Sequence, residues 1–214
     1  MAQLPALRIG LTGGIGSGKS TAATLLVGHG AILVDTDAIG RQLTLPGGAA
    51  IAPIRAAFGA DAIDADGGLD RERMRALVFA DAPTRRRLEG ILHPLIWIEA
   101  SRLCTPSPSR VIVFDVPLLV ESERWRSAVD RVLVIDCREA TQVERVVRRA
   151  GWSADAACAV MAQQAGRQTR RACADAVIYN DGISLDALGV QVRDLWAQWC
   201  GPSPARPSHE TIKA

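Results

Sequence analysis

The feature that most constrains this chain is a glycine-rich stretch near its start, LTGGIGSGKST at residues 11–21. Residues 13–20 fit the pattern G-x-x-x-x-G-K-[ST]. The preceding run LRIGLT is typical of a buried strand, and the following run STAATLLVGHG carries apolar residues at helical spacing before Gly28 and Gly30. A strand, a glycine loop and a helix in this order predict a phosphate-binding loop in an α/β fold.

The residues of this loop suit polyphosphate chemistry. Glycines let backbone N–H groups surround phosphate oxygens, and the start of the helix adds positive potential. Lys19 would neutralise charge on the β- and γ-phosphates, and Ser20 would ligate Mg²⁺. The chain has only two lysines, Lys19 and Lys213, against a large number of arginines. A general bias toward arginine explains the scarcity, while a lysine at this position indicates a need for a compact ammonium group.

Three further apolar runs, each containing an aspartate at or near its end, predict buried parallel strands: AILVD at 31–35, RVIVFDV at 110–116 and RVLVID at 131–136. Helical patterns separate them, so we predict a parallel α/β sheet. Between 39 and 105 the pieces IAPIRAAFG, RERMRALVFA and RRRLEGILHPLIWIEASRL predict helices joined by the turn DADGG, and hence a helical insertion. We expect a loop at 105–109 and a disordered tail at 201–214.

Several aspartates at strand ends are candidates for catalysis. Asp35 and Asp37 follow a predicted strand, where open α/β sheets form ligand crevices, and one of them could act as a base. The alternative is a helix N-cap plus a surface carboxylate, and the sequence leaves both open. Asp115 ends another strand and resembles a Walker B carboxylate, which could hold the water shell of Mg²⁺.

Two groups of basic residues follow the last predicted strand. Arg145, Arg148 and Arg149 can share one helix face, and QQAGRQTRR adds three more arginines. Such faces are usually solvated surface, but phosphoryl transfer also needs cations over the γ-phosphate. His93 precedes Pro94, and we predict that it caps or packs a helix end.

Composition excludes several other classes of protein. With 48% hydrophobic and 22% charged residues in 214, the chain suits one sizeable core, with room for a subdomain. It has no apolar run near the ~20 residues that span a bilayer and no leader pattern, so we expect a cytoplasmic protein without a membrane partner. Five scattered cysteines without a C-x-x-C pair argue against disulfides and zinc. The net charge of +2 without a like-charge run gives no support for nucleic-acid binding.

A set of motifs extends this interpretation: LTGGIGSGKST, VDTDAIGR, FGADAIDADGGLDR, the His93-Pro94 pair, VPLLVE at 116–121, RVVRR, and ADAVIYNDG at 174–182. In this order the chain resembles the dephospho-CoA kinase family over roughly residues 8–195. The resemblance implies a three-layer P-loop NTPase-type α/β fold with a parallel sheet. It also implies ATP-dependent phosphorylation of the 3′-hydroxyl of dephospho-CoA, the last step of coenzyme A biosynthesis, with Mg²⁺ accompanying ATP and no obligate protein partner.

The same resemblance divides the chain into parts. It implies one kinase domain at 8–200, with core segments at 8–38, 110–136 and 175–200. The helical insertion at about 39–105 would bind the acceptor, and a lid would lie at about 138–173.

The resemblance also assigns roles to individual residues. Asp37 resembles the general base, and Arg145 and Arg149 match lid arginines that act with Lys19 on the transferred phosphate. Acceptor contacts are implied for His93, Leu118 and Glu121 as well as Asp37. Nucleotide contacts are implied for the loop and for the segment that forms the adenine site: Gly14, Gly16, Ser17, Gly18, Lys19, Ser20, Thr21, Asn180 and Gly182. Ala150 departs from the family, since many members have aspartate after the second lid arginine.

Other P-loop proteins provide the alternatives. A GTPase would need N-K-x-D, but the single asparagine, Asn180, is followed by Asp181, so that class is excluded. A nucleotide-binding module without catalysis would not need Asp37, Lys19 and the arginines together. A kinase of the nucleoside-monophosphate type shares the P-loop, the lid and the insertion. The family motifs favour dephospho-CoA over that alternative, because spacing alone does not identify the acceptor.

Overall fold

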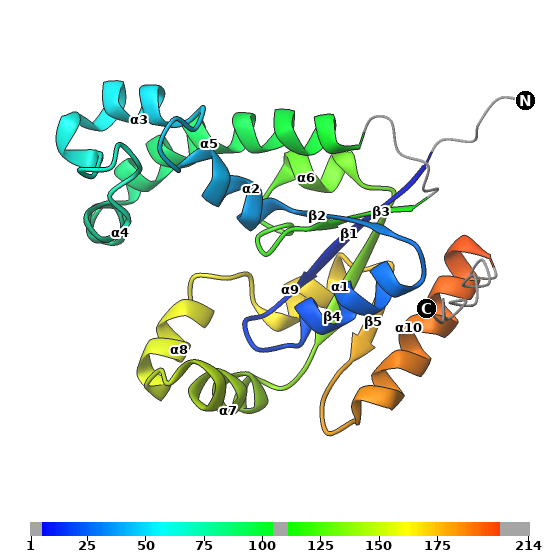
Figure 1. Cartoon of the computed structure of the whole chain (residues 1–214). Coiled ribbons are helices and arrows are strands. Elements are labelled where there is room, and N and C mark those ends of the chain that lie inside the picture. Colours follow the sequence, from blue (N-terminus) through cyan, green and yellow to red (C-terminus); the bar gives the residue numbers. More distant parts are fainter. Residues whose placement is uncertain (1–5, 105–110, 202–214) are drawn as a thin grey trace, which may run out of the picture. The chain divides into compact units, whose positions relative to one another are not determined.

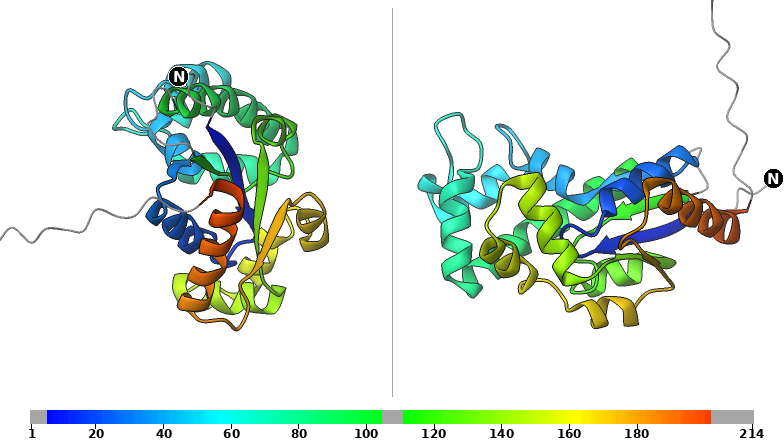
Figure 2. Two further views of the ribbon diagram at one scale, coloured as in Figure 1. Left: turned by 90° about the vertical axis from the view of Figure 1, so that its right-hand side faces the viewer. Right: turned by 90° about the horizontal axis from the view of Figure 1, so that it is seen from below.

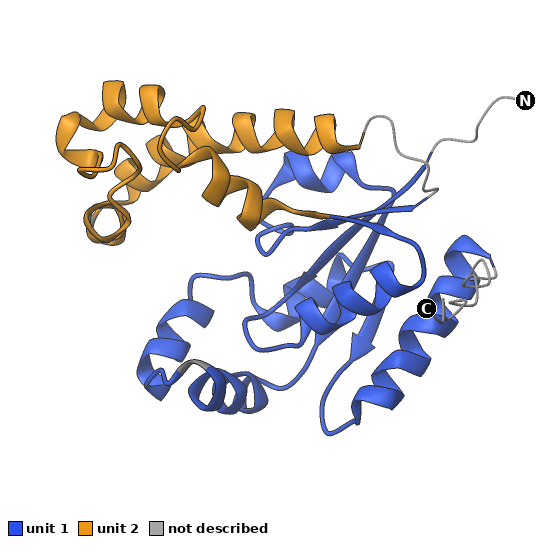
Figure 3. Cartoon of the chain, viewed as in Figure 1, with its two compact units in different colours: residues 1–33, 108–214 blue, residues 34–107 orange. Residues whose placement is uncertain are grey.

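The computed structural model describes residues 6–104 and 111–201 (Figure 1). The loop expected at 105–109, the tail expected after 201 and the side chains of Ala80 and Ala150 lie outside the described part. The chain divides into two compact units, shown in Figure 3. Unit 1 comprises residues 1–33 and 108–214, and unit 2 comprises residues 34–107.

The sheet has five strands: β1 (Leu7–Gly13), β2 (Ile32–Asp35), β3 (Val111–Asp115), β4 (Arg131–Asp136) and β5 (Ala176–Tyr179). Their order across the sheet is β2-β3-β1-β4-β5. β1 pairs in parallel with β3 on one side and β4 on the other, and β4 pairs in parallel with β5. This confirms the predicted parallel sheet and adds β5, which the apolar pattern alone did not identify as a strand.

Helices cover both faces of the sheet in unit 1 (Figure 2). On one face α1 (Lys19–Gly28) and α10 (Leu185–Cys200) enclose a core with the alternate strand residues, such as Ile9 and Leu11 of β1. On the other face α6 (Glu123–Ala128) places Trp125 5.5 Å from Phe114, measured between ring centroids. Successive side chains of each strand thus pack into cores on opposite faces of the sheet. The sheet and the helices on its two faces form the three layers predicted for the fold.

Three short helices follow β4 within unit 1: α7 (Glu139–Ala150), α8 (Ala154–Met161) and α9 (Arg167–Ala172). They occupy most of the segment expected to be a lid. α7 packs against α8, and α9 packs against β4. Because the side chain of Ile135 lies in the α1–α10 core, that of the next residue, Asp136, points to the other face of the sheet, where α9 lies.

Unit 2 is helical, as predicted for the insertion. It contains α2 (Thr36–Leu43), α3 (Ile51–Phe58), the 3₁₀ turn η1 (Ala60–Ala62), α4 (Arg71–Ala80) and α5 (Ala82–Leu103). Its own core holds five buried side chains, Ala50, Ile54, Ala62, Leu69 and Met74. The predicted turn is stabilised by Asp64, whose carboxylate accepts hydrogen bonds from the N–H groups of Asp66 and Gly68.

The prediction that His93 caps or packs a helix end is wrong. His93 and Pro94 lie in the middle of α5, which continues to Leu103. A proline removes one backbone hydrogen bond and strains the preceding turn, but it does not stop a helix that packing holds in place. Four side chains at helical spacing on both sides of the proline pack against the core of unit 2: Leu88, Ile91, Leu92 and Leu95. No helix in the described ranges is long and apolar enough to cross a membrane.

Candidate active site

The predicted phosphate-binding loop connects β1 to α1 in unit 1. Two of its glycines, Gly16 and Gly18, have φ values of 74° and 94°, which favour residues without a Cβ atom. Gly18 is the N-cap of α1, so the helix begins at Lys19. The first N–H groups of a helix have no partner within it, and the helix dipole adds positive potential there. The loop therefore has the local structure of an anion site.

Lys19 and Asp115 form an ion pair beside this loop, with Lys19 Nζ donating to Asp115 Oδ1. Asp115 is the last residue of β3, and its side chain is only 10% exposed. The structure thus brings together two residues that sequence analysis selected separately. Ser20, the other predicted metal ligand, is exposed in the first turn of α1.

The donor groups present suit Mg²⁺. The hydroxyl of Ser20 and the carboxylate of Asp115 are hard oxygen donors, and Mg²⁺ in nucleotide sites commonly uses one or two protein ligands together with phosphate oxygens and water. Residues 6–104 and 111–201 contain no cluster of three or more histidines, cysteines or carboxylates that could hold a metal by themselves.

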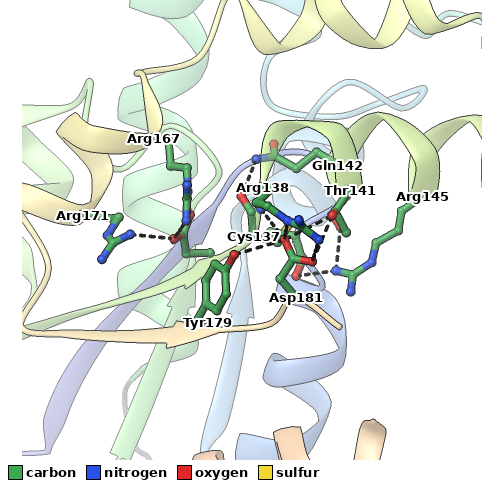
Figure 4. Close-up of polar contacts among 12 residues, drawn as sticks. Cys137, Arg138, Thr141, Gln142, Arg145, Arg167, Arg171, Tyr179 and Asp181 are labelled. Atoms are coloured by element: carbon green, nitrogen blue, oxygen red, sulfur yellow. Dashed lines mark hydrogen bonds and ion pairs between the residues drawn. The ribbon is translucent and has the colours of Figure 1, made fainter. Parts of the chain in front are cut away.

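Side chains from distant segments hold the phosphate-binding loop. Arg145 Nη1 on α7 lies 3.3 Å from the carbonyl oxygens of both Gly16 and Ser17 (Figure 4). Asn180 Nδ2 donates to the Ser17 carbonyl at 2.7 Å, and Gln164 Oε1 accepts from the Ile15 N–H at 3.1 Å. Arg145 and Asn180, predicted as a lid residue and an adenine-site residue, thus contact the backbone of the loop. Neither contact was predicted from the sequence.

Asp136, at the end of β4, fixes α9 to the sheet through Arg167 and Arg171. Its carboxylate accepts two hydrogen bonds of 2.8 Å from Arg167 Nε and Nη2, and Arg171 Nη1 lies 3.5 Å away. The side chain of Asp136 is 2% exposed. This hydrogen-bonded pairing raises the pKa of Arg167. Arg167 and Arg171 therefore attach α9 to the sheet by pairing with Asp136, and they are not part of a purely solvated helix face.

Asp181 fixes the start of α7 in a similar way. Its carboxylate accepts from the backbone N–H of Arg138 at 2.8 Å, from Arg138 Nε at 2.9 Å and from Thr141 Oγ1 at 3.1 Å (Figure 4). The hydrogen bonds from Arg138 hold the pKa of Asp181 well below its usual value. The aspartate at the end of the run RVLVID is a sequence signal for Asp136, but no local pattern predicts a role for that residue or for Asp181.

The remaining arginines of α7, Arg148 and Arg149, are both exposed. Arg148 lies 3.5 Å from Glu144, four residues earlier on the exposed side of the helix. Arg148 therefore belongs to a solvated, charged helix face, which is one of the two alternatives that the sequence left open. Among the three arginines of α7, Arg145 is the one that contacts the phosphate-binding loop.

Glu121 and Leu118, predicted to contact the acceptor, follow β3 in unit 1. Glu121 Oε1 accepts a hydrogen bond of 2.6 Å from the N–H of Ala165, in the connection between α8 and α9. Ala165 directly follows Gln164, which binds the loop, so Glu121 braces the segment that carries this contact. Leu118 is 43% exposed.

The two candidate bases of unit 2 differ in what they do. Asp35 is the N-cap of α2, and its side chain accepts from the Ala38 N–H at 2.8 Å. Asp37 lies in the first turn of α2 with an exposed side chain. The capping role therefore belongs to Asp35. His93 is exposed on α5.

All five cysteines are free thiols. Burial raises the pKa of Cys137, which follows Asp136, and raises that of Cys200 to about 11. These two thiols stay protonated at neutral pH.

Comparison with known proteins identifies the family. The dephospho-CoA kinase family model matches residues 7–186. A dephospho-CoA kinase of Dechloromonas aromatica is 54% identical over 206 residues, covering 96% of this chain and 97% of the relative. That of Albidiferax ferrireducens is 53% identical over 192 residues, covering 88% and 91%. The crystal structure of TT1252 from Thermus thermophilus superimposes with a TM-score of 0.81 at 29% identity, covering 92% of this chain and 100% of that one. The chain therefore belongs to the dephospho-CoA kinase family.

Proposed function

We propose that the chain transfers the γ-phosphoryl group of ATP to the 3′-hydroxyl of dephospho-CoA, giving coenzyme A and ADP, the last step of coenzyme A biosynthesis. The observation that carries this proposal is the phosphate-binding loop with its Lys19–Asp115 pair in a chain of this family. In the reaction the acceptor oxygen forms a bond to the γ-phosphorus. The bond from that phosphorus to the bridging oxygen breaks, and ADP leaves with the bonding electrons.

The loop would provide binding and charge stabilisation. Its N–H groups and Lys19 would hold the phosphate chain, since charge on the transferring group is what such an enzyme stabilises. Gly14, Ser17, Ser20 and Thr21 belong to the same loop and first helical turn. Ser20 and Asp115 would hold Mg²⁺, whose positive charge would offset that of the phosphates.

Asp37 is our candidate for the general base, the group that takes the proton of the attacking hydroxyl. One observation favours it over Asp35: the carboxylate of Asp35 is engaged as the N-cap of α2. Asp37 lies in the first turn of the same helix with an exposed side chain. Both residues lie at or just after the end of β2, and strand ends in open α/β sheets are where ligands bind.

The other assignments complete the proposal. We propose acceptor contacts for His93, Leu118 and Glu121, with unit 2 as the acceptor-binding part. We propose that Asn180 and Gly182 belong to the adenine segment, and that Arg145 and Arg149 serve a lid at about 138–173. Arg145 is partly buried beside the loop, which supports a role near the phosphates. A cytoplasmic location without an obligate protein partner remains our expectation from the sequence.

A comparison of acceptors tests the proposal against the related class of nucleoside-monophosphate kinases. ADP release is measured by a coupled assay with ATP and Mg²⁺, in the presence of dephospho-CoA, of AMP or of no acceptor. We expect kcat/KM to be highest for dephospho-CoA and slow release without an acceptor. A higher kcat/KM for AMP would contradict the assignment, and equal release without any acceptor would indicate an ATPase.

A further inference from the structure

Asn180 connects the segment after β5 to the phosphate-binding loop. Its Nδ2 donates to the carbonyl oxygen of Ser17 at 2.7 Å, across 163 positions of sequence. The residue is 8% exposed, so this bond is protected from water. The backbone N–H of Asn180 donates to the carbonyl of Asp136 at 2.7 Å, which fixes the residue to the end of β4. The amide of Asn180 is thus held in place by the sheet.

The direction of this bond matters for the loop. In a trans peptide unit the C=O of one residue and the N–H of the next point in opposite directions. A bond that holds the Ser17 carbonyl toward Asn180 therefore turns the Gly18 N–H away from Asn180. Gly18 is the N-cap of α1, and the N–H groups at this end of the helix are those that an anion would bind.

The contact is also tight. A Cβ atom on Gly18 would lie 2.2 Å from Asn180 Nδ2, so the side chain packs directly on the backbone of the loop. The Ser17 carbonyl has a second donor in Arg145 Nη1, but at 3.3 Å and from a longer side chain. The neighbouring Asp181 is fixed by Arg138 and Thr141 (Figure 4). Of the two donors to the Ser17 carbonyl, Asn180 therefore makes the shorter hydrogen bond and has the more firmly fixed side chain.

We propose that Asn180 is a positioning residue for the phosphate-binding loop, acting through its amide on the Ser17 carbonyl and thereby on the direction of the Gly18 N–H. This rests on the proposed function, because the ligand of the loop is taken to be the polyphosphate chain of ATP. It goes beyond the adenine-site role, because it predicts an effect on phosphate binding that does not depend on the base.

Inorganic tripolyphosphate, which has no base, separates the two roles. Affinities for ATP and for tripolyphosphate are measured by calorimetry for the full chain and for Asn180→Ala and Asn180→Leu. Both variants remove the shorter of the two hydrogen bonds to the Ser17 carbonyl, and the net value of one such bond corresponds to roughly 2- to 10-fold, so we expect the affinities for ATP and tripolyphosphate to fall by a similar factor of this size. Gln198→Ala, which truncates an exposed amide on α10, is the control and should change neither affinity.

A pH series on Asn180→Asp tests the hydrogen bond itself. The variant is nearly isosteric, its ionised carboxylate repels the Ser17 carbonyl, and its protonated form carries an O–H that can donate. We expect its tripolyphosphate affinity, relative to the unmodified chain at the same pH, to recover as pH falls. At the lowest pH it should exceed that of Asn180→Leu, which is also uncharged. Circular dichroism at each pH confirms that the compared proteins are folded.

Three results would overturn the inference. One is unchanged tripolyphosphate affinity in the Ala and Leu variants. Another is weaker ATP binding with unchanged tripolyphosphate binding, which indicates contact with the base. A third is equal affinity of the Asp and Leu variants at every pH. Failure of the unmodified chain to bind ATP would contradict the proposed function, and the inference with it.

Discussion

At the scale of single residues, the site is built from polar groups that are paired across long stretches of sequence. Lys19 and Asp115 are separated by 96 positions and form one ion pair, with both side chains largely buried. Asn180 and Arg145 hold the carbonyl groups of the loop. In a partly dehydrated site such interactions are stronger than in water, so each one has a testable effect.

Lys19→Ala should lower kcat by about 10²–10³, the range found when one electrostatic stabiliser of a transition state is removed. The variant also leaves Asp115 without its cation. Thermal unfolding should therefore be measured alongside steady-state rates with ATP and dephospho-CoA. Lys213→Ala, at the other lysine, is the control and should have unchanged rates. A Lys19→Ala protein with normal kcat would show that this ammonium does not act on the transferring phosphate.

Asp37→Asn should lower kcat on the order of 10²–10⁴ while the affinities for ATP and dephospho-CoA survive, because it removes a basic site but keeps size and polarity. We expect a loss near the lower end of this range, since the proton is removed late in a loose transition state. The matched control is Asp35→Ala, which removes the cap of α2. It should destabilise the protein by about 1 kcal/mol and leave kcat much less affected. The opposite pattern, with kcat lost at position 35, would make Asp35 the base.

At the scale of elements, two carboxylates at strand ends attach the helices that follow β4. Asp136 binds Arg167 of α9, and Asp181 binds Arg138 and Thr141 at the start of α7. Both carboxylates are nearly inaccessible to solvent, at 2% and 4% of the side chain. The helices expected to form the lid are thus fastened at both ends, which limits any closing motion to the part between them.

The Asp181 attachment predicts a dependence of stability on pH. The pKa of Asp181 is below its ordinary value of 3.8 in the folded chain, so its contribution to stability is fully present above that ordinary value. The contribution is lost as pH falls through the folded pKa. The difference in Tm between the unmodified chain and Asp181→Asn should be constant near neutral pH and should shrink below about pH 4. A difference independent of pH down to pH 2 would show that ionised Asp181 does not stabilise α7.

The same elements show what sequence patterns can and cannot predict. β3 and β4 are continuous apolar runs buried on both faces, and such runs are recognisable without a structure. β5 has four residues, of which only Ile178 is buried, so it has no such run. The helical pattern of 85–103 predicted α5 through Leu103, but the expectation that His93 lies at a helix end was wrong, because the local rule for proline does not include the packing of Leu88 to Leu95.

Some site residues could likewise be predicted from local sequence patterns, whereas the contacts of others depend on tertiary structure. Lys19 and Ser20 lie within one local motif, so their chemistry could be predicted from spacing. The contact of Asn180 with Ser17 depends on the order of β1, β4 and β5 in the sheet, which no local pattern contains. The resemblance predicted an acceptor contact for Glu121, and the hydrogen bond that its carboxylate accepts from the N–H of Ala165 was not predicted. Which atoms a polar residue meets is decided by tertiary structure, and the family resemblance supplied roles but not these contacts.

At the scale of the whole molecule, the chain combines a P-loop α/β unit with a largely helical unit that begins within β2 and spans residues 34–107. The first unit contains the residues expected to bind ATP, and the second contains Asp37 and His93. A kinase needs both a nucleotide site and an acceptor site, since orienting two reactants provides much of the catalytic effect. This division of the chain is consistent with the membership of the chain in the dephospho-CoA kinase family.

The most direct test of the central claim is the mass of the acceptor after reaction. Dephospho-CoA is incubated with ATP, Mg²⁺ and the full chain, and the product is analysed by liquid chromatography and mass spectrometry beside authentic coenzyme A. We predict that dephospho-CoA gains one phosphate group and elutes with coenzyme A, and that the Lys19→Ala protein gives far less of this product. Unchanged dephospho-CoA after prolonged incubation, or a phosphorylated product that separates from coenzyme A, would contradict the account.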